Sequence, residues 1–149
     1  MIKYIADNKI KATFVLQQNP ADSGVACLAS LVNFHGGDFS LSAIRELSGA
    51  VTEGPTLLGL YQAAQQLGYD AEGLQATSAR DLVDFRETAI LHVSTKKSIN
   101  HFLVYYGYYK GFLIIGDPTR GILNYTCEDL DKIWQSKSLL KLKPNVNFV

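Results

Sequence analysis

The chain changes character near Glu87, from segments with helical periodicity to short segments typical of β-strands. From Gly24 to about Gly73, apolar residues recur at three- and four-residue steps, the spacing of amphipathic helices. After Glu87, runs of β-branched and aromatic residues alternate with Gly, Asn and Asp-Pro turn signals, which indicates strands joined by hairpins. Helices followed by strands predict an α+β domain, with N-terminal helices packed on one face of a C-terminal antiparallel sheet.

Caps and breakers set the expected limits of these elements. A first helix begins near Gly24 and ends at the glycines of 35–38, and a second follows Ser40, a good N-cap. A third runs from Pro55, which suits a first helical turn, to Gly68, which suits the position after a helix C-terminus. Further elements are expected as a short helix at 78–86, strands at 89–93, 101–109, 111–117 and 121–126, and a short helix at 127–135.

Length and charge exclude several classes of protein. The 149 residues fit a single domain over 1–149, with a core at about 10–140 and a linker at 141–149, where caps and periodicity are lacking. Fourteen basic residues balance fourteen acidic ones, so nothing in the charge suggests a nucleic-acid partner. No apolar run approaches the ~20 residues that span a bilayer, and the N-terminus has no secretory signal.

The cysteines and histidines do not suggest a metal or another cofactor. Cys27 and Cys127 are the two cysteines of the chain, a number that fits a reducing compartment better than a disulfide scaffold. Together with three scattered histidines they show no ligand spacing. We therefore expect neither a metal nor any other cofactor.

Four residues could form a nucleophilic site, which needs an attacking group, a base, a group that orients the base, and an oxyanion donor. Ser23 lies at the expected start of the first helix, whose positive end favours an anionic nucleophile. His101 begins one expected strand and Asp117 ends the next, so an antiparallel hairpin would bring them together. Gln17, six residues before Ser23, could supply an amide to an oxyanion.

Each of these residues also has a purely structural interpretation. Ser23 in an Asp-Ser-Gly turn could be a helix N-cap, and Asp117-Pro118 is a common turn initiator. His101 could be a satisfied structural histidine, and His35 and His92 compete with it for any catalytic role. From the residues alone, the catalytic and structural interpretations both stay open.

The segment QQNPADSGVACL, residues 17–28, resembles the active-site segment of bacteriocin-processing peptidase domains, which are papain-like and lie at the N-terminus of peptidase-containing ABC transporters. The family pattern is Gln, four variable residues, Asp-Cys-Gly, any residue, then Ala-Cys-Leu. The resemblance continues through 54–69, 89–93 and 100–121 and covers about residues 10 to 140. The matching residues of the first segment are Gln17, Asp22, Gly24, Ala26, Cys27 and Leu28.

The resemblance implies a papain-like cysteine peptidase fold and a role for each candidate residue. His101 looks like the general base, Asp117 the residue that orients it, and Gln17 the oxyanion-hole donor. Ser23 stands where the family has its nucleophilic cysteine, while Cys27 matches a second, non-catalytic cysteine. A thiol forms a nucleophilic anion near neutral pH far more readily than a hydroxyl, so the resemblance implies a domain inactivated at this position.

Three explanations of Ser23 stay open: an engineered change from cysteine, a naturally degenerate domain that binds its substrate without cutting it, and a true serine peptidase. The resemblance further implies cleavage after a double-glycine leader, which would bind as an amphipathic helix on an apolar groove. The implied partners are the leader peptide and the transmembrane and ATP-binding regions of one transporter, reached through 141–149. The expected location is the cytoplasmic face of the bacterial plasma membrane, with the isolated domain a soluble monomer.

Two other classes of function are open. One is a docking module that holds a secretion substrate for a transporter. The other is a free-standing amidase or transglutaminase-like hydrolase on the same fold.

Overall fold

The structure, a computed structural model, describes residues 2–49, 55–96 and 100–148, and within them helices cover both faces of one antiparallel sheet. The helices are α1 (Ile2–Thr13), α2 (Ser23–Phe34), α3 (Leu41–Leu47), α4 (Leu57–Gln66), the 3-10 turn η1 (Ala79–Leu82) and α5 (Cys127–Ile133). The strands are β1 (Tyr69–Gln75), β2 (Thr88–Val93), β3 (His101–Tyr109), β4 (Phe112–Asp117), β5 (Gly121–Tyr125) and β6 (Ser138–Pro144). Among the described residues their order in the sheet is β1-β6-β2-β3-β4-β5. The predicted α+β class is confirmed.

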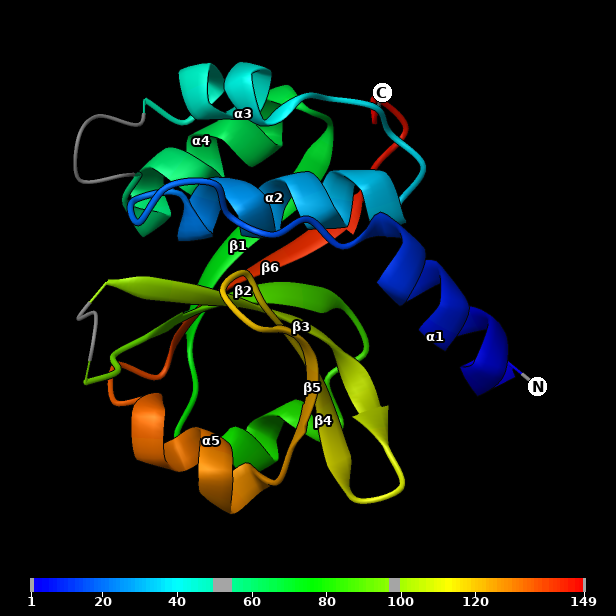
Figure 1. Ribbon diagram of the computed structural model, residues 1–149, viewed down its shortest axis with the longest axis vertical. Coiled ribbons are helices and arrows are strands. Elements are labelled where there is room, and N and C mark those ends of the chain that lie inside the picture. Colours follow the sequence, from blue (N-terminus) through cyan, green and yellow to red (C-terminus); the bar gives the residue numbers. More distant parts are fainter. Residues whose placement is uncertain (1, 50–54, 97–99, 149) are drawn as a thin grey trace.

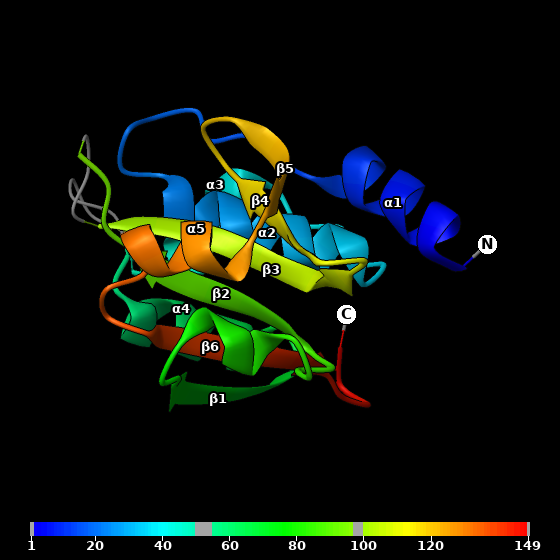
Figure 2. The ribbon, with the colours of Figure 1, turned by 90° about the horizontal axis from the view of Figure 1, so that it is seen from below.

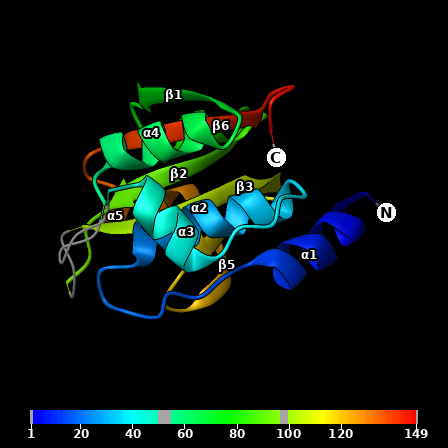
Figure 3. The ribbon, with the colours of Figure 1, turned by 90° about the horizontal axis from the view of Figure 1, so that it is seen from above.

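The sheet separates two apolar clusters, because successive side chains of a strand point to opposite faces. Helices α2, α3 and α4 lie on one face and α5 with η1 on the other (Figure 1). Seen from above, α2 lies along β3, and α4 lies along β1 and β6 (Figure 3). Seen from below, α5 lies in front of the sheet (Figure 2). Phe102 and Val104 of β3 therefore join the α2 cluster, whereas Leu103 and Tyr105 join the α5 cluster.

Helix α2 is buried on all sides from Ser23 to Val32, so it is the central helix of the α2 cluster. It packs on β3 and is covered by α1, α3 and α4. The chain turns away after it at Gly36, whose φ of +94° is accessible at little cost to glycine. Burial of the whole helix holds its first residue, Ser23, at one position against the sheet.

Several predicted caps are confirmed. The Ser40 hydroxyl accepts a hydrogen bond from Ala43 N at 3.1 Å and so caps α3. Gly68 follows the end of α4 with φ +95°. The N-cap of α4 is Thr56, which accepts from Gly59 N, so Pro55 lies just before the helix and not in its first turn.

Three segments differ from the sequence-based prediction. No strand is predicted between the third helix and residue 88, yet β1 lies there, and 78–86 contains only the η1 turn. Residues 141–144 were expected to be a linker but complete β6, which pairs with both β1 and β2. Successive side chains of β6 point to opposite faces, so Leu140 and Leu142 lie in the α2 cluster and Leu139 in the α5 cluster.

Tertiary contacts explain the short η1 turn. The Tyr105 hydroxyl donates to the Leu82 carbonyl at 2.6 Å, and Asp131 accepts from Ala79 N at 2.8 Å. These bonds hold both ends of the turn against β3 and α5. In the described part of the chain, no helix is both long and apolar enough to cross a membrane.

Candidate active site

His101 and Asp117 are hydrogen-bonded, with 2.8 Å between His101 Nε2 and Asp117 Oδ1. The contact forms because β3 begins at His101 and β4 ends at Asp117, and the two strands pair antiparallel. The proximity expected from the hairpin is thus present. Both residues are buried, at 6% and 5% exposure. Since Nε2 faces the carboxylate, Nδ1 is the ring nitrogen left to exchange a proton with a reacting group.

Thr119 provides two further donors to the same carboxylate oxygen. Its backbone N lies 3.0 Å and its Oγ1 2.8 Å from Asp117 Oδ1. Burial alone would raise the pKa of Asp117, but the hydrogen bonds from His101 and Thr119 outweigh burial and hold that pKa below its ordinary value. An ionised Asp117 can fix the orientation of the His101 ring and stabilise its protonated form.

Ser23 is the first residue of α2, and its hydroxyl lies against the beginning of β3. Its Oγ accepts a hydrogen bond of 3.2 Å from the backbone N of Phe102, the residue that follows His101. The side chain is not the helix cap, because Asp22 occupies the N-cap position. The fold therefore brings Ser23 against the residue that follows His101, from a segment 79 positions away, although Ser23 is only 3% exposed.

Asp22 fixes the chain immediately before Ser23. Its carboxylate accepts two hydrogen bonds from the Arg45 guanidinium, at 3.2 Å from Nε and 2.7 Å from Nη2. Asn19 Nδ2 contacts the same carboxylate at 3.3 Å. This bidentate ion pair connects α3 to the start of α2 and restrains the loop that carries Gln17.

Gln17 lies beside the Asp117 turn, but its amide group points toward its own loop. Its backbone N donates to the Pro118 carbonyl at 2.9 Å, and Nε2 donates to the Asn19 carbonyl at 3.0 Å. Gln17 Oε1 is buried without a hydrogen-bond partner in the described part of the protein. Gln17 Nε2 also lies 3.5 Å from the Pro20 carbonyl. Stabilisation of an oxyanion by Gln17 would thus require a rotation of the amide, and it stays a prediction.

The other cysteines and histidines lie outside this arrangement. Cys27 is fully buried one turn after Ser23, and burial, with a smaller effect of the Asp117 charge, raises the pKa of its thiol. His35 is bonded to the Tyr69 hydroxyl at 2.8 Å at the other end of α2, and His92 to Asn100 at 3.0 Å. Within the described residues, no cluster of three or more His, Cys, Asp or Glu could hold a metal ion.

Two cavities flank the beginning of β3. One, of about 290 Å³, is lined by Pro55, Thr56, Leu57, His92, Asn100, Phe102 and Ser138. The other, of about 710 Å³, is lined by Thr95, Lys96, His101, Leu103, Asp117, Thr119, Arg120, Tyr125 and Ile133.

The sequence analysis did not single out Arg45, Thr119 or Arg120. Of these three residues, only Thr119 could have been found from the sequence, because it lies two residues after Asp117.

Comparison with known proteins gives consistent matches to one family. A model of the Peptidase C39 family matches residues 11–147. The lactococcin-G-processing and transport ATP-binding protein LagD of Lactococcus lactis is 28% identical over 135 residues, which are 90% of this chain and 19% of that protein. The pediocin PA-1 transport/processing ATP-binding protein PedD of Pediococcus acidilactici is 33% identical over 106 residues, 70% of this chain and 15% of that protein. The chain thus spans less than a fifth of the length of these relatives.

Solved structures agree with this result. The peptidase domain of Streptococcus ComA, a bi-functional ABC transporter involved in quorum sensing, superimposes with a TM-score of 0.79 at 32% identity, covering 88% of this chain and 97% of that chain. A double glycine motif protease from an AMS/PCAT transporter, solved in complex with the leader peptide, gives a TM-score of 0.77 at 25% identity, covering 88% and 90%.

Proposed function

This chain belongs to the peptidase C39 family, and we propose that it is the leader-peptidase domain of a bacterial ABC exporter, with Ser23 in the nucleophile position. The observation that carries the proposal is the buried His101–Asp117 hydrogen bond, with the Ser23 hydroxyl bonded to the backbone of the residue that follows His101. The substrate class follows from the relatives, which process bacteriocins or cut at double glycine motifs by their descriptions.

The residues are arranged for acyl transfer. The side chain at position 23 would attack the carbonyl of the scissile bond while His101 Nδ1 takes its proton. The C–N bond then breaks, and His101 returns the proton to the leaving amine. Water hydrolyses the acyl-enzyme by the same steps in reverse. Asp117 would hold the ring, and Gln17 with a backbone N–H would stabilise the oxyanion.

We propose that serine at position 23 disables this chemistry and leaves binding intact. A hydroxyl must lose its proton during attack, whereas a thiol beside a histidine already exists partly as the thiolate. In addition, C–O bonds are shorter than C–S bonds, so the oxygen sits farther from a substrate positioned for sulfur. Low turnover with retained leader binding is the expected state of this form.

An apolar surface leads away from Ser23 and suits an amphipathic leader helix. It is lined by Leu57, Leu58, Tyr61, Gly73 and Leu140, and Leu58 is 62% exposed. Leu57 also lines the cavity at Phe102, so the two surfaces are continuous. We call this combined surface the leader groove. Gly24, which follows Ser23, is closely packed, because a Cβ there would lie 3.0 Å from Leu60 Cδ1 and 3.2 Å from Phe102 Cδ2.

A paired cleavage assay tests the proposal. The chain and its Ser23→Cys variant are incubated with a precursor peptide that carries a double-glycine leader, and products are identified by mass spectrometry. The cysteine form is expected to cut after the second glycine at least 100-fold faster, an order-of-magnitude expectation for loss of a nucleophile. A Ser23→Cys/His101→Ala variant is the matched control and should be inactive.

Two outcomes would contradict the proposal. Equal turnover by the serine and cysteine forms would show a working serine peptidase. If neither form cuts but both bind the leader in a fluorescence anisotropy titration, the domain is a docking module, the second function that a serine at position 23 favours.

A further inference from the structure

The 710 Å³ cavity lies on the opposite face of β3 from the leader groove and borders the His101–Asp117 pair directly. His101 and Leu103 line this cavity, whereas Phe102, which lies between them in sequence, lines the leader groove. Neighbouring residues of a strand point to opposite faces. The two cavities thus meet at the beginning of β3, where the scissile bond would lie.

A peptide cut at this point must have chain on both sides of it. If the leader occupies the apolar groove along α4, the residues after the cleaved bond continue past His101 toward the second cavity. This assignment rests on the proposed function. We call the second cavity the cargo pocket, since the cargo is the part of the precursor that follows the leader.

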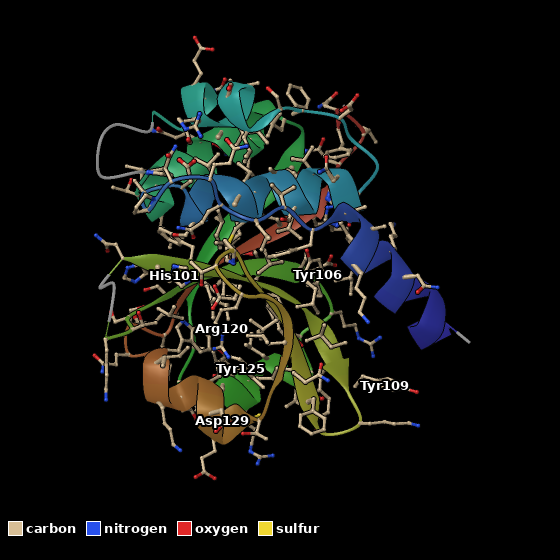
Figure 4. All side chains as sticks on the ribbon, viewed as in Figure 1. His101, Tyr106, Tyr109, Arg120, Tyr125 and Asp129 are labelled. Atoms are coloured by element: carbon tan, nitrogen blue, oxygen red, sulfur yellow. The ribbon has the colours of Figure 1, made fainter. Side chains whose placement is uncertain are left out.

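The cargo pocket has a cationic rim on a largely apolar floor. Lys96 and Arg120 are both exposed at its edge, and Leu103 and Ile133 form part of its floor. Figure 4 shows Arg120 and Tyr125 between the curved strands and α5, on the side of the sheet that faces away from α2. Among the described residues that line the pocket, Asp117 is the acidic one, and its Oδ1 already accepts from His101 and Thr119.

The charges around the pocket therefore leave the rim positive. Arg120 and Tyr125 line the pocket together, so the guanidinium lies beside it. Asp129 on α5 lies on the side of Tyr125 away from Arg120 (Figure 4) and does not line the pocket. A carboxylate of the substrate would meet Arg120 and Lys96 here without an acidic group free to compete.

We propose that the cargo pocket binds the first residues after the cleaved bond and favours an acidic side chain there over a basic one. The leader groove would supply most of the affinity, and the pocket would discriminate between cargoes by charge. Because Arg120 and Lys96 are exposed, the discrimination should be modest and should weaken with salt.

The test uses the Ser23→Cys form and precursor peptides with one constant leader. Each peptide carries Glu, Gln or Lys at one of the first three positions after the bond, and kcat/KM is measured for each. At one position or more, Glu is expected to exceed Lys by about two- to fivefold, the range of exposed ion pairs. Arg120→Glu should reverse this order. In the parent, 0.5 M salt should reduce the ratio of kcat/KM between the Glu and Lys peptides.

Arg86→Glu is the matched control, because Arg86 is an exposed arginine in the loop before β2 that does not line the pocket. It should keep the preference for Glu. Equal kcat/KM for Glu and Lys peptides, or an unchanged order in Arg120→Glu, would overturn this inference while the proposed function stands. Failure of the Ser23→Cys form to cut any peptide would overturn the proposed function and this inference with it.

Discussion

At the scale of single residues, Asp117 is held by more than its histidine partner. Its Oδ1 accepts from His101 and twice from Thr119, so Thr119 is expected to position the carboxylate. In the Ser23→Cys form, Thr119→Val should lower kcat/KM by about tenfold, since a hydrogen bond to a charged group contributes ~1.5 kcal/mol or more. Loss of one donor should also raise the pKa of Asp117 and shift the acid limb of the pH profile upward.

Thr119→Ser keeps the hydroxyl and is the control for this prediction. It should restore both the rate and the pH profile. A valine variant with unchanged kcat/KM and an unchanged profile would show that the Thr119 hydroxyl has no part in positioning Asp117.

At the scale of elements, α3 and α4 approach so closely that only a hydrogen fits at Gly59. A Cβ there would lie 2.5 Å from the backbone oxygen of Ser48. Gly59→Ala should therefore push the two helices apart and lower the free energy of unfolding by about 1–3 kcal/mol, as overpacking does. Chemical denaturation measures this change. Gly73→Ala, in β1 where a Cβ would contact nothing within 4 Å, is the control.

The end of α2 joins β1 through His35, which should make stability depend on pH. Burial, with a smaller effect of the Lys9 charge, lowers the pKa of His35 from 6.5 to about 4. Between these values the unfolded chain binds a proton that the folded protein does not, so the free energy of unfolding falls as pH drops from 6.5 to about 4. His35→Gln should lose less stability than the parent between pH 7 and pH 4.5 in denaturant titrations. Equal losses would contradict this account.

At the scale of the whole molecule, the last strand joins β1 to the rest of the sheet. β6 lies between β1 and β2 and contributes apolar side chains to both clusters. A chain that ends at Lys137 should therefore lose cooperative unfolding and near-UV circular dichroism, because β1 is left without a partner strand. A chain that ends at Pro144 keeps β6 and should retain both signals, although it loses the packing of Phe148 on Tyr69. A cooperative transition in the shorter chain would contradict the role given to β6.

Local patterns were sufficient for the central parts of the fold. The buried helix α2, helix α4 with its glycine end, and the strands β3 and β4 all follow from periodicity and turn residues between neighbours in sequence. The contact of His101 with Asp117 follows as well, since a hairpin relates positions that lie close together in the chain. The membership in the peptidase C39 family agrees with the resemblance found in residues 17–28 and beyond.

What only the tertiary structure decided depends on residues far apart in sequence. Tyr69 pairs with Pro144, and neither segment has a local pattern strong enough to mark β1 or β6 as a strand. The Asp22–Arg45 ion pair, the orientation of the Gln17 amide and the cargo pocket likewise depend on how separate elements pack. Periodicity reports which face of a segment is apolar, but packing alone determines which other segment covers that face and which polar groups meet beside it.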